Sequence, residues 1–169
     1  MKTICAFILG ILLMLPGCGA KKPVISGTIL PESDDPKIIA EQYQESFAKW
    51  QRKNIRAYTM VFRYGAFSPF AGIWEIDVAD RQTKRRVFEG SAVGEETQMM
   101  ANLNMERLYN LAAPATNAKP EGPFIIQARF FQDGGVALVR RVVNPAAAGS
   151  GPRDANWSYE VREVRSLSR

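Results

Sequence analysis

Four large apolar residues, Ile39, Tyr43, Phe47 and Trp50, recur at helical spacing along an otherwise polar segment of the chain. Residues separated by three or four positions lie on one side of an α-helix, so these four side chains form one stripe. An aromatic stripe at this spacing is typical of a helix face packed in a core. The pattern therefore predicts a first amphipathic helix with its aromatic face buried.

Both predicted helices have recognisable ends. Asp35 followed by Pro36 is typical of an N-terminus, and Asn54 can adopt the left-handed conformation that ends a helix. A second helix is expected to begin at Asn104, as its N-cap, and to end at Pro114. The residues predicted for its buried face are Met105, Leu108, Tyr109 and Ala112.

Elsewhere apolar and polar residues alternate with a period of two, as in strands with one buried face. The predicted strands cover residues 57–64, 73–78, 84–90 and 157–164, and a hairpin over residues 124–143 turns at Asp133, Gly134 and Gly135. Short turns between strands require antiparallel pairing. The sequence thus predicts an α+β fold, an antiparallel sheet of about six strands with two helices on one face, in the order α-β-β-β-α-β-β-β.

The N-terminus has the composition of an export signal. Lys2 precedes an apolar run over residues 4–15, which is too short to cross a bilayer because a spanning helix needs about 20 apolar residues. Leu15, Pro16, Gly17 and Cys18 follow, and they resemble the bacterial lipobox, although the proline departs from the usual residue at its position. The resemblance implies cleavage between Gly17 and Cys18 and attachment of lipid to Cys18.

This interpretation divides the chain into a signal peptide (1–17), a lipidated Cys18 with a flexible tether (18–34) and one globular domain (35–169). Fatty chains of the palmitate type on Cys18 would anchor the protein to a membrane of the cell envelope. Gly19 is not the aspartate that signals inner-membrane retention, which favours the outer membrane, facing the periplasm. An ordinary secreted protein cut elsewhere, or a buried thiol at Cys18, remains the alternative.

Composition narrows the possible chemistry. The 169 residues carry a formal net charge of +5 and include no histidine and two cysteines. Cys5 would leave with the signal and Cys18 would carry lipid, so the mature domain would have no imidazole and no free thiol for catalysis or metal binding. We therefore expect no cofactor and a binding or accessory protein rather than an enzyme.

One enzymatic alternative remains open. Glu75 and Asp77 share a strand face about 7 Å apart, within range of a paired acid and base or of a hard cation. They are the candidate residues for a weak carboxylate- or metal-dependent hydrolase. The competing hypothesis places them on a solvated face, in cross-strand ion pairs with basic residues of the runs 84–86 and 140–141. Adjacent residues of a strand point to opposite faces, so each basic run can present only about half of its charge to one partner. Nucleic acid is therefore not an expected partner.

A loop between two predicted strands offers a candidate contact surface. Phe67, Pro69 and Phe70 lie together in the segment GAFSPFAG, where large apolar side chains could meet an envelope protein. Local packing of these side chains against the core explains the same composition equally well.

The order of several motifs resembles a known group of proteins. Trp50, a strand opened by Tyr58, a strand over residues 73–78, the helix segment ERLYNL and the closing segment YEVREVRSL are similar to small bacterial lipoproteins catalogued as domain of unknown function 6174. The likeness covers about residues 47–167. Since that group has no established activity, the resemblance implies an architecture and an envelope location but no mechanism.

Two departures limit what the resemblance carries over. Such proteins commonly have a Cys-x-Cys-Pro stretch after the first strand, where this chain has Gly-Ala-Phe-Ser-Pro over residues 65–69. They tend to have Gly-Tyr-Pro in the hairpin, where this chain has Asp-Gly-Gly over residues 133–135. Any role of that cysteine pair is therefore absent here.

Overall fold

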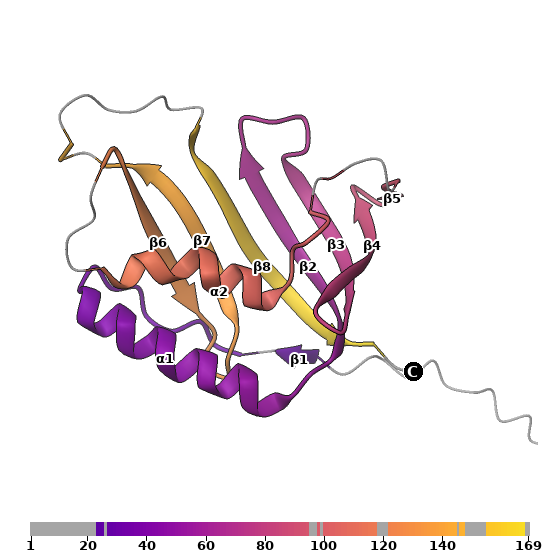
Figure 1. Ribbon diagram of the computed structural model, residues 1–169, viewed down its shortest axis with the longest axis horizontal. Helices are drawn as coiled ribbons and strands as arrows, with labels where there is room; N and C mark the ends of the chain where they lie inside the picture. The colour runs from indigo at the N-terminus through magenta and orange to yellow at the C-terminus, as the bar shows by residue number, and fades with distance from the viewer. Residues whose placement is uncertain are drawn as a thin grey trace, which may run out of the picture.

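The fold is an antiparallel sheet of eight strands with two α-helices on one face (Figure 1). A computed structural model describes residues 23–25, 27–94, 98, 100–117, 122–144, 146–147 and 155–167. The helices are α1 (Pro36–Lys53), α2 (Met105–Ala112) and the short 3₁₀-helix η1 (Ala113–Thr116). The strands are β1 (Pro23–Ile25), β2 (Ala57–Ala66), β3 (Gly72–Ala79), β4 (Gln82–Phe88), β5 (Ser91–Ala92), β6 (Phe124–Phe130), β7 (Val136–Val143) and β8 (Trp157–Ser166).

Two consecutive groups of strands make up the sheet. The strand order is β5-β4-β3-β2-β8-β7-β6, so β2 to β5 form one half and β6 to β8 the other. The halves join where β2 pairs with β8, for example at Phe62 and Val161. The last strand of the chain therefore lies in the middle of the sheet, and β1 pairs with the part of β8 that β7 does not reach.

The predicted class is confirmed, whereas the predicted number and order of strands differ from the structure. Eight strands are present because β1 precedes the first helix and β5 follows β4. These two strands have three and two residues, too few to show an alternating pattern. No helix among the described residues combines the length and apolar composition needed to cross a bilayer.

The segment expected to be a tether is packed against the domain in its described part. Ile25 is only 3% exposed, Ile29 forms a bridge with Phe131, and the Leu30 N–H donates to the Phe130 carbonyl at 2.8 Å. Its Gly, Pro and Ser residues resemble a linker, but backbone hydrogen bonds to distant strands hold it in place. The predicted signal peptide, Gly17 and Cys18 lie outside the described residues.

Predicted helix ends are confirmed. The Asp35 carboxylate accepts from the Lys37 N–H at 2.9 Å, and Asn54 ends α1 in the left-handed conformation with φ of 47°. The Asn104 side chain accepts from the Arg107 N–H at 2.7 Å, as an N-cap does. The chain continues beyond α2 as η1, which contains the predicted stop at Pro114.

The core lies between the sheet and the helices. Trp50 packs edge-on against Tyr58, with ring centroids 5.4 Å apart, and Trp74 is fully buried. In the predicted helix stripe Ile39 and Trp50 are buried, while Tyr43 and Phe47 are half-buried. The alternation along β2, β3 and β8 leaves their opposite faces on the helix-free side of the sheet.

Candidate functional site

Glu75 and Asp77 lie on the helix-free face of β3, because the intervening Trp74, Ile76 and Val78 point into the core. One nitrogen of the Arg85 guanidinium lies 3.0 Å from an oxygen of Glu75 and 3.0 Å from an oxygen of Asp77. These hydrogen bonds, first the one to Asp77 and then the one to Glu75, raise the pKa of Arg85.

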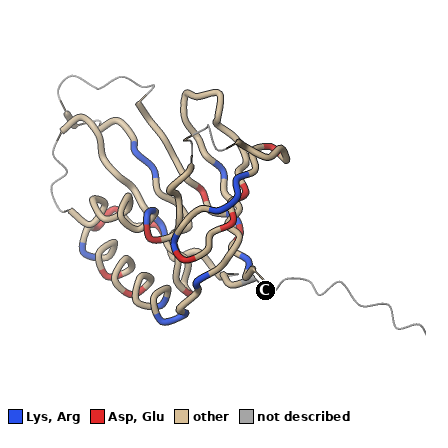
Figure 2. The backbone as a smooth tube through the Cα atoms, turned by 45° about the vertical axis from the view of Figure 1, so that its right-hand side comes forward, with Lys and Arg blue, Asp and Glu red and all other residues tan. Residues whose placement is uncertain are grey.

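Further donors occupy the same two carboxylates. Thr59 Oγ donates to Asp77 at 2.7 Å, and Arg165 donates to the second oxygen of Glu75 at 3.0 Å. Asp77 lies opposite Arg85 on the neighbouring strand β4. Figure 2 shows acidic and basic positions close together on the backbone of the domain. Both carboxylates thus form cross-strand ion pairs, which confirms the solvated-pair hypothesis for Arg85. In the described part of the chain no three His, Cys, Asp or Glu side chains gather to hold a metal ion.

The structure separates the three residues of the candidate contact loop. Phe67 is 90% exposed, and Pro69 is also exposed. Phe70 instead packs against Trp74 and Phe88, at centroid distances of 6.3 and 6.2 Å. The Phe70 carbonyl also accepts from the Trp74 indole N–H at 2.9 Å. Phe70 therefore belongs to the edge of the core, and of the two phenylalanines in this loop it is Phe67 that presents a large apolar surface to solvent.

Phe67 borders a shallow hollow where β2 ends, β7 ends and β8 begins. Its volume is about 300 Å³, and we call it the hairpin-end hollow. It is lined by Gly65, Ala66, Phe67, Arg140, Arg141, Val142, Asn156, Trp157 and Ser158. The lining contains two arginines and no acidic residue, so the hollow is positively charged. Its remaining side chains include the apolar Phe67, Val142 and Trp157.

Arg141 is held in place at this hollow by three contacts. Its Nε donates to the Ala155 carbonyl at 2.9 Å, and its guanidinium carbon lies 4.8 Å from the centroid of the Phe124 ring and 5.8 Å from that of Trp157. Such cation–π contacts fix the orientation of the guanidinium. The hollow therefore presents a preorganised cation next to an exposed aromatic ring.

Aromatic rings continue from the hollow along the helix side of the sheet. Tyr159 lies 5.6 Å from Trp157 and 5.0 Å from Tyr64, measured between ring centroids. Burial raises the pKa of Tyr159 to about 12, and it also raises that of Tyr64. These phenols remain neutral at ordinary pH and act as apolar surface with a hydroxyl group.

Sequence reasoning identified Phe67 but not its neighbours in the hollow. In the sequence, Arg141 is half of a basic pair and Trp157 begins a predicted strand, and neither pattern indicates that the two lie together. Their proximity depends on β8 entering the sheet between β2 and β7. The one local indication of the hollow is Trp157, a large aromatic residue that directly follows a segment containing Gly and Pro.

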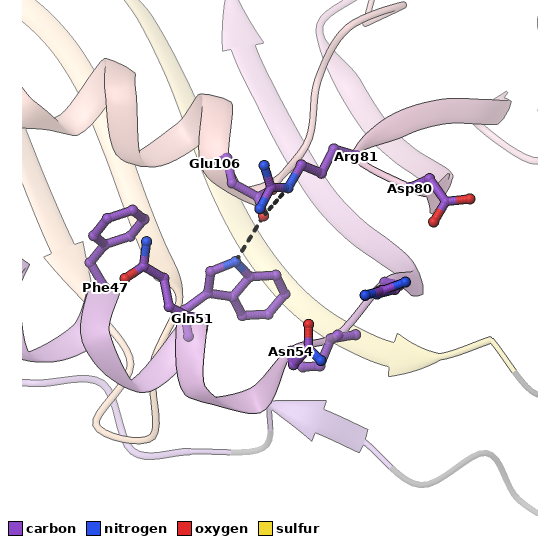
Figure 3. Close-up of a pocket in the computed structure, with 9 residues that line it drawn as sticks. Phe47, Gln51, Asn54, Asp80, Arg81 and Glu106 are labelled. Atoms are coloured by element: carbon purple, nitrogen blue, oxygen red, sulfur yellow. Dashed lines mark hydrogen bonds and ion pairs between the residues drawn. The ribbon is translucent and has the colours of Figure 1, made fainter.

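A second pocket lies between the end of α1, the turn joining β3 to β4, and the start of α2 (Figure 3). Its volume is about 530 Å³. The Trp50 indole N–H donates to Glu106 at 3.4 Å, and the Arg81 Nε lies 4.0 Å from the same oxygen. Asp80, also in the lining, points away from this pair in Figure 3. The lining contains Arg56 and Arg81 as well as Asp80 and Glu106. The pocket therefore carries both signs of charge and favours no single ligand charge.

Compared with protein-family models, curated proteins and solved structures, the chain matches none. Membership in the family catalogued as domain of unknown function 6174 therefore stays a prediction, and the site must be interpreted from its own geometry.

Proposed function

We propose that this chain is a lipid-anchored protein of the bacterial cell envelope that binds a protein partner and has no catalytic activity. The order of a short apolar run, a small residue and Cys18 supports a lipoprotein signal, with the anchor in the outer membrane and the domain in the periplasm. The absence of histidine from the sequence and the pairing of Glu75 and Asp77 with arginines support a binding role.

The partner site in this proposal is the hairpin-end hollow. The observation that carries it is the 90% exposure of Phe67 beside a hollow that Trp157 and Arg141 also line. Aromatic and arginine side chains contribute most of the binding energy at protein interfaces, particularly where their geometry is fixed before binding. A matching partner segment would carry an apolar side chain for the rings and a carboxylate for the guanidinium group.

The hydrolase alternative is less well supported by the geometry. A general acid or base must have an oxygen available to exchange a proton with substrate. Both oxygens of Glu75 and both oxygens of Asp77 accept hydrogen bonds from Arg85, Arg165 or Thr59. A substrate would have to displace these donors. Replacement of both acids by their amides, Glu75→Gln with Asp77→Asn, should leave any hydrolytic activity of the preparation unchanged.

Two measurements test the proposal. Mass spectrometry of the mature protein should find a diacylglycerol-modified Cys18 as the first residue, whereas a free thiol there would exclude the lipid anchor. Cross-linking in intact envelopes should give a discrete adduct that Phe67→Asp abolishes. The matched control is Ile38→Asp, which adds the same charge at an apolar side chain 43% exposed on α1. An adduct that survives Phe67→Asp would reject the hollow as the docking site.

A further inference from the structure

The chain enters the described domain at one end of the sheet. β1 runs antiparallel to β8, with Pro23 opposite Arg165, so Pro23 lies at the end of the sheet where β8 finishes (Figure 1). The β3–β4 turn lies at this end too, since the Asp80 N–H donates to the Arg56 carbonyl at 2.8 Å. We call this the anchored end, defined by Pro23, the basic residues Arg52 and Lys53 in the last turn of α1, residues 54–56 and residues 80–81.

The chain between Cys18 and this end is short. Four residues, 19–22, separate Cys18 from Pro23, and five residue steps span at most about 18 Å. α1 alone has 18 residues and is about 27 Å long. The domain is wider than the maximum length of this connection. It therefore cannot rotate freely above a bilayer to which Cys18 is attached. If Cys18 carries lipid, the anchored end must be the part of the domain nearest the membrane.

Among the charged side chains exposed at the anchored end, the basic ones outnumber the acidic ones. Arg52, Arg56 and Arg81 are exposed, with Arg81 having 83% of its side chain accessible, and we call these three the basic rim. Figure 2 shows the basic last turn of α1 at the bottom of the molecule, toward the marked C-terminus. Asp80 is the exposed acid in the lining of the adjoining pocket.

Two of the nearby acids are already paired with other cations of α1. Glu45 lies 2.6 Å from Lys49 Nζ, and Asp133 lies 3.0 Å from Lys53 Nζ. These pairs use charges of both signs within the protein. Within the rim itself, Arg81 lies 4.0 Å from Glu106, and Asp80 is the exposed acid, so the three arginines exceed these two acids by one positive charge. Anionic phospholipids attract such residues when a short linker keeps them near the surface.

We propose that the anchored end lies against the bilayer and that the basic rim contacts phosphate groups of anionic phospholipids. This inference rests on the proposed lipid anchor. It gives the molecule a fixed polarity, because β2 runs from the anchored end at Ala57 to the hairpin-end hollow at Ala66. Ten residues of strand cover about 33 Å, so the hollow faces away from the membrane.

Vesicle binding without the lipid isolates the contribution of the rim. A form beginning at Gly19 retains every described residue and should sediment with vesicles containing phosphatidylglycerol, but not with pure phosphatidylcholine. Arg52→Gln with Arg56→Gln should weaken this binding about 25-fold, about fivefold per charge. Lys37→Gln with Arg63→Gln removes two exposed cations elsewhere and should have little effect. Equal losses in the two double variants would overturn the assignment of this surface.

The acylated protein tests orientation. Since the mature chain would have no free thiol, a probe on Gln82→Cys or Ala71→Cys labels one position, at the anchored end or at the opposite end respectively. A quencher attached to lipid headgroups should affect the probe at 82 and spare the probe at 71. Equal quenching would reject the orientation. A protein that lacks lipid but keeps rim-dependent vesicle binding would instead reject the proposed anchor and retain the phospholipid surface.

Discussion

Ser46 is the residue whose role differs most from its appearance in the sequence. It is a polar residue between apolar positions of α1, yet it is only 1% exposed. Ser46 Oγ donates to the Gly135 carbonyl at 3.2 Å and accepts from the Gly135 N–H at 3.1 Å, and its oxygen lies 2.7 Å from the Tyr109 hydroxyl. The helical period places Ser46 on the same side of α1 as Tyr43 and Trp50, but its polar side chain gave no indication of its partners, because these come from α2 and the β6–β7 turn.

This network predicts coupled losses of stability. Ser46→Ala and Tyr109→Phe should each lower the free energy of unfolding by about 1–2 kcal/mol, since each removes hydrogen bonds to the buried Gly135 backbone. The double variant should lose less than the sum, because each single change already disrupts the shared network. Urea unfolding of the four proteins measures the coupling. Strict additivity would show that the two hydroxyls act independently.

Buried phenols predict sensitivity to alkaline pH. Burial raises the pKa of Tyr109 to about 12 and that of Tyr58 further, so the folded state favours their protonated forms. Their contribution is complete below pH 10, the unfolded value, and is lost as the pH rises toward the folded value. For Tyr109 this amounts to roughly 3 kcal/mol between about pH 10 and 12.

Spectroscopic titration checks this expectation. The phenolate absorbance of the buried tyrosines should rise together with the loss of the near-ultraviolet circular dichroism signal. Phenolate formation in a chain that keeps its tertiary signal would contradict the burial of these hydroxyls.

At the scale of elements, the sequence pattern correctly predicted the helices and the hairpin whose own residues determine their structure. α1 and α2 have N-caps and apolar faces, and the β6–β7 hairpin turns at Gly134 and Gly135, which have φ of 99° and 119°. The sequence pattern did not predict β1, because the pairing of β1 with β8 depends on residues about 140 positions away in the sequence. A three-residue strand has no period from which to predict it.

Ile25 distinguishes a packed β1 from a free tether. Ile25→Ala should lower the free energy of unfolding by about 2–4 kcal/mol, because the side chain is 3% exposed and its truncation leaves a cavity. Ile29→Ala is the matched control: that side chain is 41% exposed and should cost much less. Chemical denaturation measures both. No change in the Ile25 variant would mean that residues 23–25 are not part of the folded domain in solution.

At the scale of the whole molecule, the pattern predicted two runs of strands but not how they meet. The joint between β2 and β8 links segments about 100 residues apart, and no local feature of either strand specifies its neighbour. The hairpin-end hollow depends on this joint, since Phe67 follows β2 and Trp157 begins β8. A loop candidate was therefore predictable from sequence, whereas the site around it was not.

The central position of β8 predicts the effect of truncation. A chain ending at Asn144 lacks the strand that connects the two halves of the sheet and should not unfold cooperatively, because β2 and β7 would each lose a partner strand. A chain ending at Leu167 retains β8 and should unfold as the full-length protein does. Thermal unfolding followed by circular dichroism compares them. A cooperative transition in the shorter chain would show that each half folds alone.

The position of β1 also determines how the domain would bear mechanical force. A pull on the chain before Pro23, opposed by a load at the hairpin-end hollow, acts nearly parallel to β1 and β8. Hydrogen bonds between antiparallel strands drawn along their length are loaded in shear and must break together. We therefore expect tension to release β1 in one step, with Lys53 giving up its bond to the Val24 carbonyl, before the larger sheet yields. The released residues would lengthen the connection to the membrane anchor. The force on the rest of the sheet would then fall before its strands separate.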